Sequence, residues 1–288
     1  MEKTQKFPRT MVGGVSLPRM LIGTNWILGY SHTSSSADDM IRRSHSTRES
    51  IAQVLEAYLE YDIDAIMAPF ENNNVLLDAI KLAEDNTGKK LIMIDTPNMD
   101  VTDSADGRAS ALRTIEASRK NGAAFCFIHH STTEKLVSKL SGTIDRLPDY
   151  LDMIRQNGML PGLSAHMPEI IVYSDANEYD VESYLQIYNC MGFLMQVEVE
   201  AVRRIIEHAK KPVMSIKSMA AGRVSPYVGL TFSYATLRPC DMVTVGAFTA
   251  KEVHEDVEIA MAAIERRYPQ VEGRASPLKT DALGARIP

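Results

Sequence analysis

The chain has 288 residues, 45% of them hydrophobic and 24% charged, so it can bury a large core. A formal net charge of −6 without a clustered basic stripe argues against nucleic acid as a main partner. No apolar stretch approaches the roughly 20 residues needed to span a bilayer, so we expect one soluble domain over residues 1–288 that acts on a small molecule.

The N-terminus begins with charged and polar residues and lacks a hydrophobic signal region, which predicts a cytoplasmic protein. Residues 10–17 follow as a short hairpin. The three cysteines, Cys126, Cys190 and Cys240, are odd in number and lack metal-finger spacing. We therefore expect reduced thiols rather than disulfides.

Eight short apolar runs alternate with helix-length amphipathic stretches along the chain. Continuous apolar character is typical of parallel strands buried on both faces, and apolar spacings of three and four predict helices between them. This rhythm predicts an α/β fold, a single (β/α)8 TIM barrel, whose active site lies at the C-terminal ends of the strands. The runs are Arg19–Leu28, Ile63–Pro69, Lys90–Pro97, Ala124–His130, Met159–His166, Tyr184–Cys190, Pro212–Ser218 and Met242–Ala247, and the clearest helices are Thr47–Glu60, Val75–Glu84 and Lys251–Arg266.

Two stretches lie outside this repeat. Residues 31–46, after the first strand, are polar and long enough to fold over the barrel mouth, so they are a lid candidate and place His32 near a ligand. Residues 273–288 mix Pro, Gly, Ser and Lys without periodicity and form either a surface tail or a flap.

Asp95, His129 and His166 end three consecutive expected strands, so their side chains are expected to converge on one wall of the mouth. Two imidazoles and a carboxylate can form an open divalent-metal site. They can equally act without metal, one His moving a proton while the carboxylate orients the other. In a purely structural alternative, Asp95 caps a helix or pairs with a lysine, and His129 is held by hydrogen bonds. His130 points to the opposite face of a regular strand and is expected to pack.

Lys217 ends the seventh expected strand, low in the mouth, where loss of water lowers the pKa of an amine and suits it to Schiff-base chemistry. The alternative is an ion pair with Glu198 or Asp95. Other strand-end residues are candidate substrate contacts or rim packing, and Trp26 offers a flat apolar wall for a sugar-like or planar ligand. The substrate-contact candidates, with His32 from the lid, are Asn25, Trp26, Glu71, Tyr188 and Asn189.

Five segments, in order, resemble the aldo/keto reductases. They are Gly14–Trp26, like the opening hairpin and first strand; Asn157–Glu169, like the fifth-strand stretch; Leu185–Asn189; Ile216–Arg223; and Val245–Val253, like the last strand and helix start. The resemblance implies a barrel with a nicotinamide dinucleotide (NAD(P)) site. Ser164 and Gln186 match residues that hold the nicotinamide amide, whereas the neighbouring family Asn is replaced by Ala165.

The same resemblance implies a catalytic set of Asp, Tyr, Lys and His, of which His129 alone matches. The second strand ends Met67–Asn72 without the Asp or Tyr, and the third ends in Asp95 where the family has Lys. A phosphate could still bind at Gly246–Glu252, where a strand feeds a helix N-terminus and Arg223 is nearby. The alternative there is an ordinary helix cap by Thr249.

These residues favour an enzyme for a small hydroxylated, sugar-like carbonyl compound, working by non-redox acid/base or metal-assisted chemistry as an isomerase, epimerase or lyase. The alternatives are a divergent NAD(P)-dependent oxidoreductase and a catalytically silent barrel that binds a metabolite or a protein partner.

Overall fold

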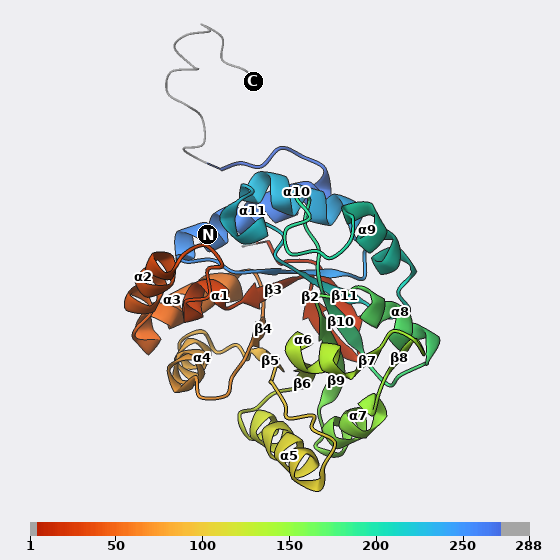
Figure 1. Ribbon diagram of the computed structural model, residues 1–288. Helices are drawn as coiled ribbons and strands as arrows, with labels where there is room; N and C mark the ends of the chain where they lie inside the picture. Colours follow the sequence, from red (N-terminus) through yellow and green to blue (C-terminus); the bar gives the residue numbers. More distant parts are fainter. Residues whose placement is uncertain (1–4, 272–288) are drawn as a thin grey trace, which may run out of the picture.

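The computed structural model describes residues 5–271, and the expected tail at 273–288 lies outside them. Eight short parallel strands close into a barrel (Figure 1) in the order β10-β11-β12-β3-β4-β5-β6-β9, and β9 pairs with β10. Each strand overlaps one of the eight apolar runs, which confirms the predicted TIM barrel. The strands are β3 (Met20–Gly23), β4 (Ala65–Ala68), β5 (Ile92–Asp95), β6 (Phe125–Ile128), β9 (Leu160–Ala165), β10 (Ser183–Ile187), β11 (Val213–Ile216) and β12 (Met242–Val245).

Side chains alternate between the barrel interior and the layer beneath the helices, because successive residues of a strand face opposite ways. Leu21, Met67, Phe127 and Met214 belong to the inner cluster, while their strand neighbours join the much larger outer core. This alternation decides which strand-end residues face the mouth.

The expected hairpin is formed by β1 (Arg9–Val12) and β2 (Val15–Pro18). Its two-residue turn is Gly13-Gly14, with φ angles of +55° and +80° that favour glycine. Val12 and Leu17 pack in the inner cluster with Ala65 at the start of β4. The hairpin therefore covers the N-terminal end of the barrel, opposite the mouth.

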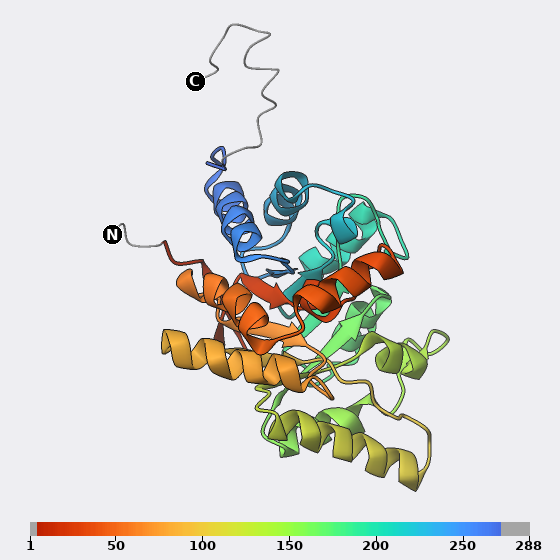
Figure 2. The same cartoon turned by 90° about the vertical axis from the view of Figure 1, so that its left-hand side faces the viewer.

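Helices surround the barrel, and α2, α3 and α4 lie along the side that faces the viewer in Figure 2. Thr47 caps α3 and Thr249 caps α11, each side-chain oxygen accepting a backbone N–H of the first turn. Within residues 5–271, no helix is both long and apolar enough to cross a bilayer. The helices are α1 (Asn25–Leu28), α2 (Ser35–Ser44), α3 (Arg48–Glu60), α4 (Asn74–Thr87), α5 (Ala105–Lys120), α6 (His130–Thr133), α7 (Leu147–Gln156), α8 (Glu169–Ala176), α9 (Val199–His208), α10 (Pro226–Thr236) and α11 (Ala250–Glu265), with 3-10 turns η1 (Glu134–Leu136) and η2 (Ala220–Gly222).

The structure departs from the expected elements in three places. The first run ends as a strand at Gly23 and turns into α1. The segment 31–46 is helical over α2 rather than a loop, because Ser34 caps the helix and Asp38 in its first turn accepts from the Ser31 backbone and hydroxyl. A small hairpin, β7 (Val137–Ser138) with β8 (Thr143–Ile144), lies between β6 and α7.

Candidate functional site

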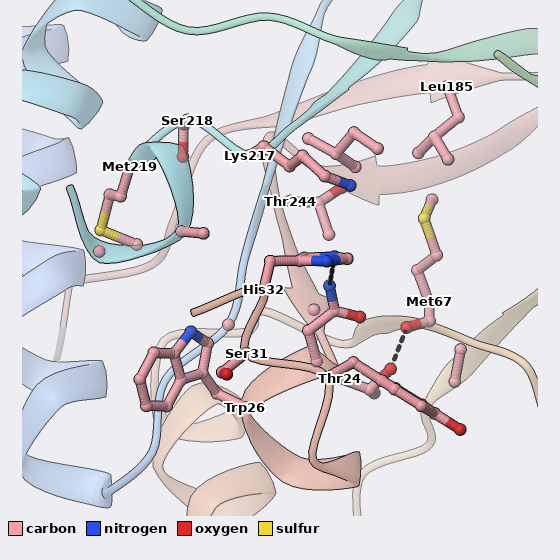
Figure 3. Close-up of a pocket in the computed structure, with 18 of the residues that line it drawn as sticks. Thr24, Trp26, Ser31, His32, Met67, Leu185, Lys217, Ser218, Met219 and Thr244 are labelled. Carbon is pink, nitrogen blue, oxygen red and sulfur yellow. Dashed lines mark hydrogen bonds between the residues drawn. The ribbon is translucent and has the colours of Figure 1, made fainter. Parts of the chain in front are cut away.

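A cavity of about 840 Å³ opens at the C-terminal ends of the barrel strands. Figure 3 shows Lys217 and His32 extending into it, with Trp26 along one side and Met67 and Leu185 deeper in the barrel. Because every strand of a parallel barrel ends at this mouth, residues distant in the sequence meet here.

Lys217 follows β11 with a left-handed backbone, φ +61°, which carries its side chain into the cavity. Burial lowers the pKa of its amine from the usual 10.5 to about 8. Neither of the two acids expected as its ion-pair partner lies beside Lys217. Asp95 is buried elsewhere, and Glu198 is exposed at the start of α9. No ion pair to Lys217 occurs in residues 5–271. A desolvated amine with no counter-charge in the described part of the chain therefore faces the cavity.

Three histidines stand in a row beside it. The ring centroids of His129 and His130 lie 4.2 Å apart, and those of His130 and His166 lie 3.6 Å apart, with the second pair stacked at 16°. All three residues line the cavity. The expectation that His130 packs away from the mouth is wrong, because the strand ends at Ile128 and the chain turns into α6 at His130, so strand alternation no longer applies.

Burial is the main cause that lowers the pKa values of His129 and His166 to about 4, and the nearby charges of His130 and Lys217 lower them further. Both rings are therefore neutral near pH 7. His129 Nδ1 lies 2.8 Å from Ser131 Oγ and also accepts the Ser131 backbone N–H, while its Nε2 has no hydrogen-bond partner within the described chain. The ring is held at one nitrogen and can exchange a proton at the other.

Glu134 is a site residue that the sequence reasoning missed. Its Oε1 accepts the backbone N–H groups of His166 at 2.8 Å and Met167 at 3.1 Å, and its Oε2 lies 3.9 Å from His130 Nδ1. The spacing His130-x-x-x-Glu134 places the two residues on one face of a helical turn and is the signal that could have found it. Its contact with His166, 32 positions away, is tertiary.

Asp95 does not join the histidines. Within β5, Ile94 faces the barrel interior, so Asp95 points into the layer beneath the helices. Its carboxylate accepts the Phe70 N–H at 3.2 Å and lies near Ser118 of α5, and burial raises its pKa. The predicted set of Asp95, His129 and His166 is therefore not assembled, either for metal or for acid/base work. Ligand atoms of His130, Glu134 and His166 instead lie within 4.8 Å of one another.

Three of the six expected substrate contacts line the cavity: Asn25, Trp26 and His32. Asn25 Nδ2 and His32 Nε2 are 3.3 Å apart, and the pKa of His32 is lowered mainly by burial and then by Lys217. Within the segment 31–46, Ser31 and His32 reach the cavity.

The other three expected contacts lie elsewhere. Glu71 is exposed on the loop after β4. Tyr188 is fully buried in the outer core, its hydroxyl donating to Thr236 Oγ1 at 2.9 Å. The Asn189 side chain stabilises its own loop, because it donates a hydrogen bond to the Phe193 carbonyl and accepts one from the Phe193 N–H. Its polar atoms are therefore used within the loop and not for substrate contact.

The expected dinucleotide residues are similarly divided. Ser164 lines the cavity, whereas Gln186 is fully buried outside it, next to the inner residue Leu185. Gln186 Nε2 donates to the Ile187 carbonyl, and its Oε1 has no hydrogen-bond partner within residues 5–271.

At the expected phosphate site, Gly246 lines the cavity but Thr249 is the cap of α11. The Glu252 carboxylate accepts the Phe248 N–H at 2.7 Å, so an anion already occupies this helix N-terminus. Glu255 and Asp256 add acidic side chains to the same wall. Arg223 is exposed and stacks 4.2 Å from the centre of the Phe193 ring. The Glu252 carboxylate therefore lies at the helix start where the sequence predicts a phosphate.

No protein-family model matches the chain. No curated protein matches it either. Among solved structures, the chain is similar over 92% of its length to a "putative aldo-keto reductase" of Pseudomonas aeruginosa, with a TM-score of 0.66, 14% identity and 99% of that chain covered. An aldo/keto reductase from Klebsiella pneumoniae in complex with NADP and acetate matches with a TM-score of 0.56 and 13% identity, over 96% of this chain and 99% of that one.

The structure of the Amycolatopsis orientalis BexX/CysO complex matches with a TM-score of 0.54 and 14% identity, over 93% of this chain and 100% of that one. At these identities the likeness establishes the barrel fold, which proteins of different function share.

Proposed function

We propose that this barrel is a lyase or isomerase that binds a small hydroxylated carbonyl compound as a Schiff base on Lys217. The observation that carries the proposal is the Lys217 amine, which extends into the cavity without an acidic partner in the described residues. A neutral amine is the nucleophile that attacks a carbonyl carbon, and burial favours the neutral form.

In this reaction the nitrogen of Lys217 forms a bond to the carbonyl carbon. The carbonyl oxygen takes one proton from the amine and one from a general acid and leaves as water, which gives a protonated imine. The imine then accepts the electron pair of an adjacent C–H bond, for isomerisation, or of a C–C bond whose far carbon bears a hydroxyl, for cleavage. A base takes the proton released from carbon or from that hydroxyl, and returns it to carbon in the resulting enamine. Water finally hydrolyses the imine and frees the amine.

His129 is suited to carry that proton. It lines the same cavity, Ser131 orients its ring through Nδ1, and its Nε2 remains available. Asn25 and His32, which contact each other and both line the cavity, offer polar groups for the substrate hydroxyls. Trp26 adds an apolar wall.

The test is reductive trapping. The protein is incubated with hydroxyacetone, dihydroxyacetone or dihydroxyacetone phosphate, treated with borohydride and digested with trypsin. Reduction of an imine gives a stable secondary amine that blocks cleavage after Lys217, so a modified peptide spanning 211–223 is expected by mass spectrometry. Lys217→Arg should lose this adduct while background labelling of exposed lysines such as Lys251 is unchanged. Labelling of Lys217 no higher than that of Lys251 with all three compounds would refute the proposal.

Dinucleotide binding tests the alternative function, a divergent NAD(P)-dependent oxidoreductase. A nicotinamide dinucleotide would have to place its phosphates at the start of α11, where Thr249 and the Glu252 carboxylate already accept backbone N–H groups. A fluorescence titration with the reduced cofactors, read from Trp26 as the only tryptophan, should therefore show no saturation up to millimolar concentration. Saturable binding below that range would favour the oxidoreductase.

A further inference from the structure

Beyond the Schiff-base site, the geometry points to a divalent-metal site, best suited to Zn²⁺, formed by His130, Glu134 and His166. One ligand atom from each residue lies within 4.8 Å of the other two. Two imidazoles and one carboxylate, with a fourth position left to water or substrate, are the ligand number and type of an open zinc site.

The local fold brings the three ligands together in a defined way. His130 begins α6 and Glu134 follows one helical turn later, so both side chains lie on the same face. His166 directly follows β9, which pairs with β6, the strand that precedes α6. The metal would thus join two neighbouring strand ends of the barrel.

The carboxylate of Glu134 is oriented as a metal ligand usually is. Its Oε1 accepts two backbone N–H groups, from His166 and Met167, which fixes the plane of the carboxylate. Its Oε2 is turned toward His130. Hydrogen bonds of this kind to a ligand's second atom hold the first atom in place for the ion.

His130 supplies an independent sign of a missing partner. Its Nδ1 is shielded from solvent and has no hydrogen-bond partner within residues 5–271. Glu134 Oε2 is 3.9 Å away from it, which is too far for a hydrogen bond. A metal ion between these two atoms would satisfy both.

The required adjustment is small. Donor atoms about 2.1 Å from a tetrahedral ion lie about 3.4 Å apart, so the separations of up to 4.8 Å would have to close by at most about 1.4 Å. The stacked rings of His130 and His166 already lie 3.6 Å apart, and rotations of the three side chains can supply the remainder. His129 is not among the three residues whose ligand atoms lie within 4.8 Å of one another.

Two of the ligands, His130 and His166, line the same cavity as Lys217, whose charge affects His166. A bound Zn²⁺ would polarise an oxygen of a substrate there. The ligand set replaces two of the three residues expected from the sequence, keeping His166 and exchanging Asp95 and His129 for Glu134 and His130.

The test is cobalt titration of the full-length protein after treatment with a chelator. Co²⁺ bound by nitrogen and oxygen ligands at low coordination number absorbs visible light, so the absorbance should rise and saturate at one equivalent. Zn²⁺ should displace the cobalt and remove the absorption. No saturable absorption, or a stoichiometry above one with no dominant site, would overturn the assignment.

Variants localise the ion. His130→Ala, Glu134→Gln and His166→Ala should each weaken cobalt binding by ~100-fold or more, since loss of an outer partner alone costs ~10–100-fold. His208→Ala, which removes an exposed histidine from α9, is the matched control and should bind as the wild type does. Equal binding by His130→Ala and His208→Ala would refute the site.

Zinc-edge X-ray absorption of the wild-type protein needs no variant and should show two imidazoles with oxygen donors, so the assignment remains testable if a variant fails to fold. Lys217→Arg, which abolishes borohydride trapping, should leave the cobalt spectrum in place. Failure of the metal site and failure of the Schiff-base proposal are therefore distinguishable.

Discussion

Replacement of Lys217 by Met should stabilise the protein at neutral pH. A pKa lowered from 10.5 to about 8 by burial means that the folded protein holds the lysine proton less tightly than the unfolded chain does. At 1.36 kcal/mol per pKa unit, the charged lysine costs the folded state about 3 kcal/mol at pH 7. Water in the open cavity screens part of this, so we expect a gain of about 1–3 kcal/mol for Lys217→Met, whose side chain is apolar and of similar length.

The pH dependence gives the sharper test. Between pH 8 and 10.5 the unfolded wild type binds more protons than the folded protein, so its stability rises with pH across this window. Lys217→Met lacks this contribution, and its advantage should therefore be full below pH 8 and fade by pH 10.5. Urea unfolding at pH 7 and pH 10 measures it, with Lys251→Met on the exposed face of α11 as the control. A Met variant less stable than wild type at pH 7, or an advantage that does not shrink at pH 10, would refute the reasoning.

Three further substitutions test the frame that holds the site, each by urea unfolding. Asp241→Ala should cost about 3–5 kcal/mol, because the fully buried carboxylate accepts two hydrogen bonds from the Arg238 guanidinium, which would lose its counter-charge; a loss below 1 kcal/mol would contradict this. Gly162→Ala should cost about 1–3 kcal/mol, since the added Cβ would lie 2.3 Å from the Phe127 ring inside the barrel, and an unchanged midpoint would show that the ring moves freely. Thr249→Ala should cost about 1 kcal/mol through loss of the α11 cap, whereas Thr249→Ser should be nearly neutral.

Sequence patterns predicted the barrel well because strands and helices are specified by residues close to one another in the chain. The apolar runs located all eight strands, and Thr47 and Thr249 marked helix starts by the hydrogen bonds that their own side chains make. The errors came where a local rule was carried too far. Strand alternation does not predict where His130 points, because the strand ends two residues earlier and a helical turn begins at His130.

The candidate site was predicted in part for the same reason. That Lys217, His129 and His166 meet at the mouth follows from their places at strand ends, since parallel strands deliver their C-terminal ends to one rim. Which way each side chain points does not follow. Asp95 shares its strand-end position with them, yet the pleat turns it toward α5.

The sequence by itself thus determined the order of strands and helices, the hairpin and the rim on which function is concentrated, because periodicity and capping act over a few residues. Tertiary structure alone decided that Lys217 has no acidic partner among residues 5–271 and that Glu134 is held by the His166 backbone. Both depend on the closure of the barrel. Closure fixes the direction in which each strand-end side chain points, and it excludes water from between groups that are far apart in the chain.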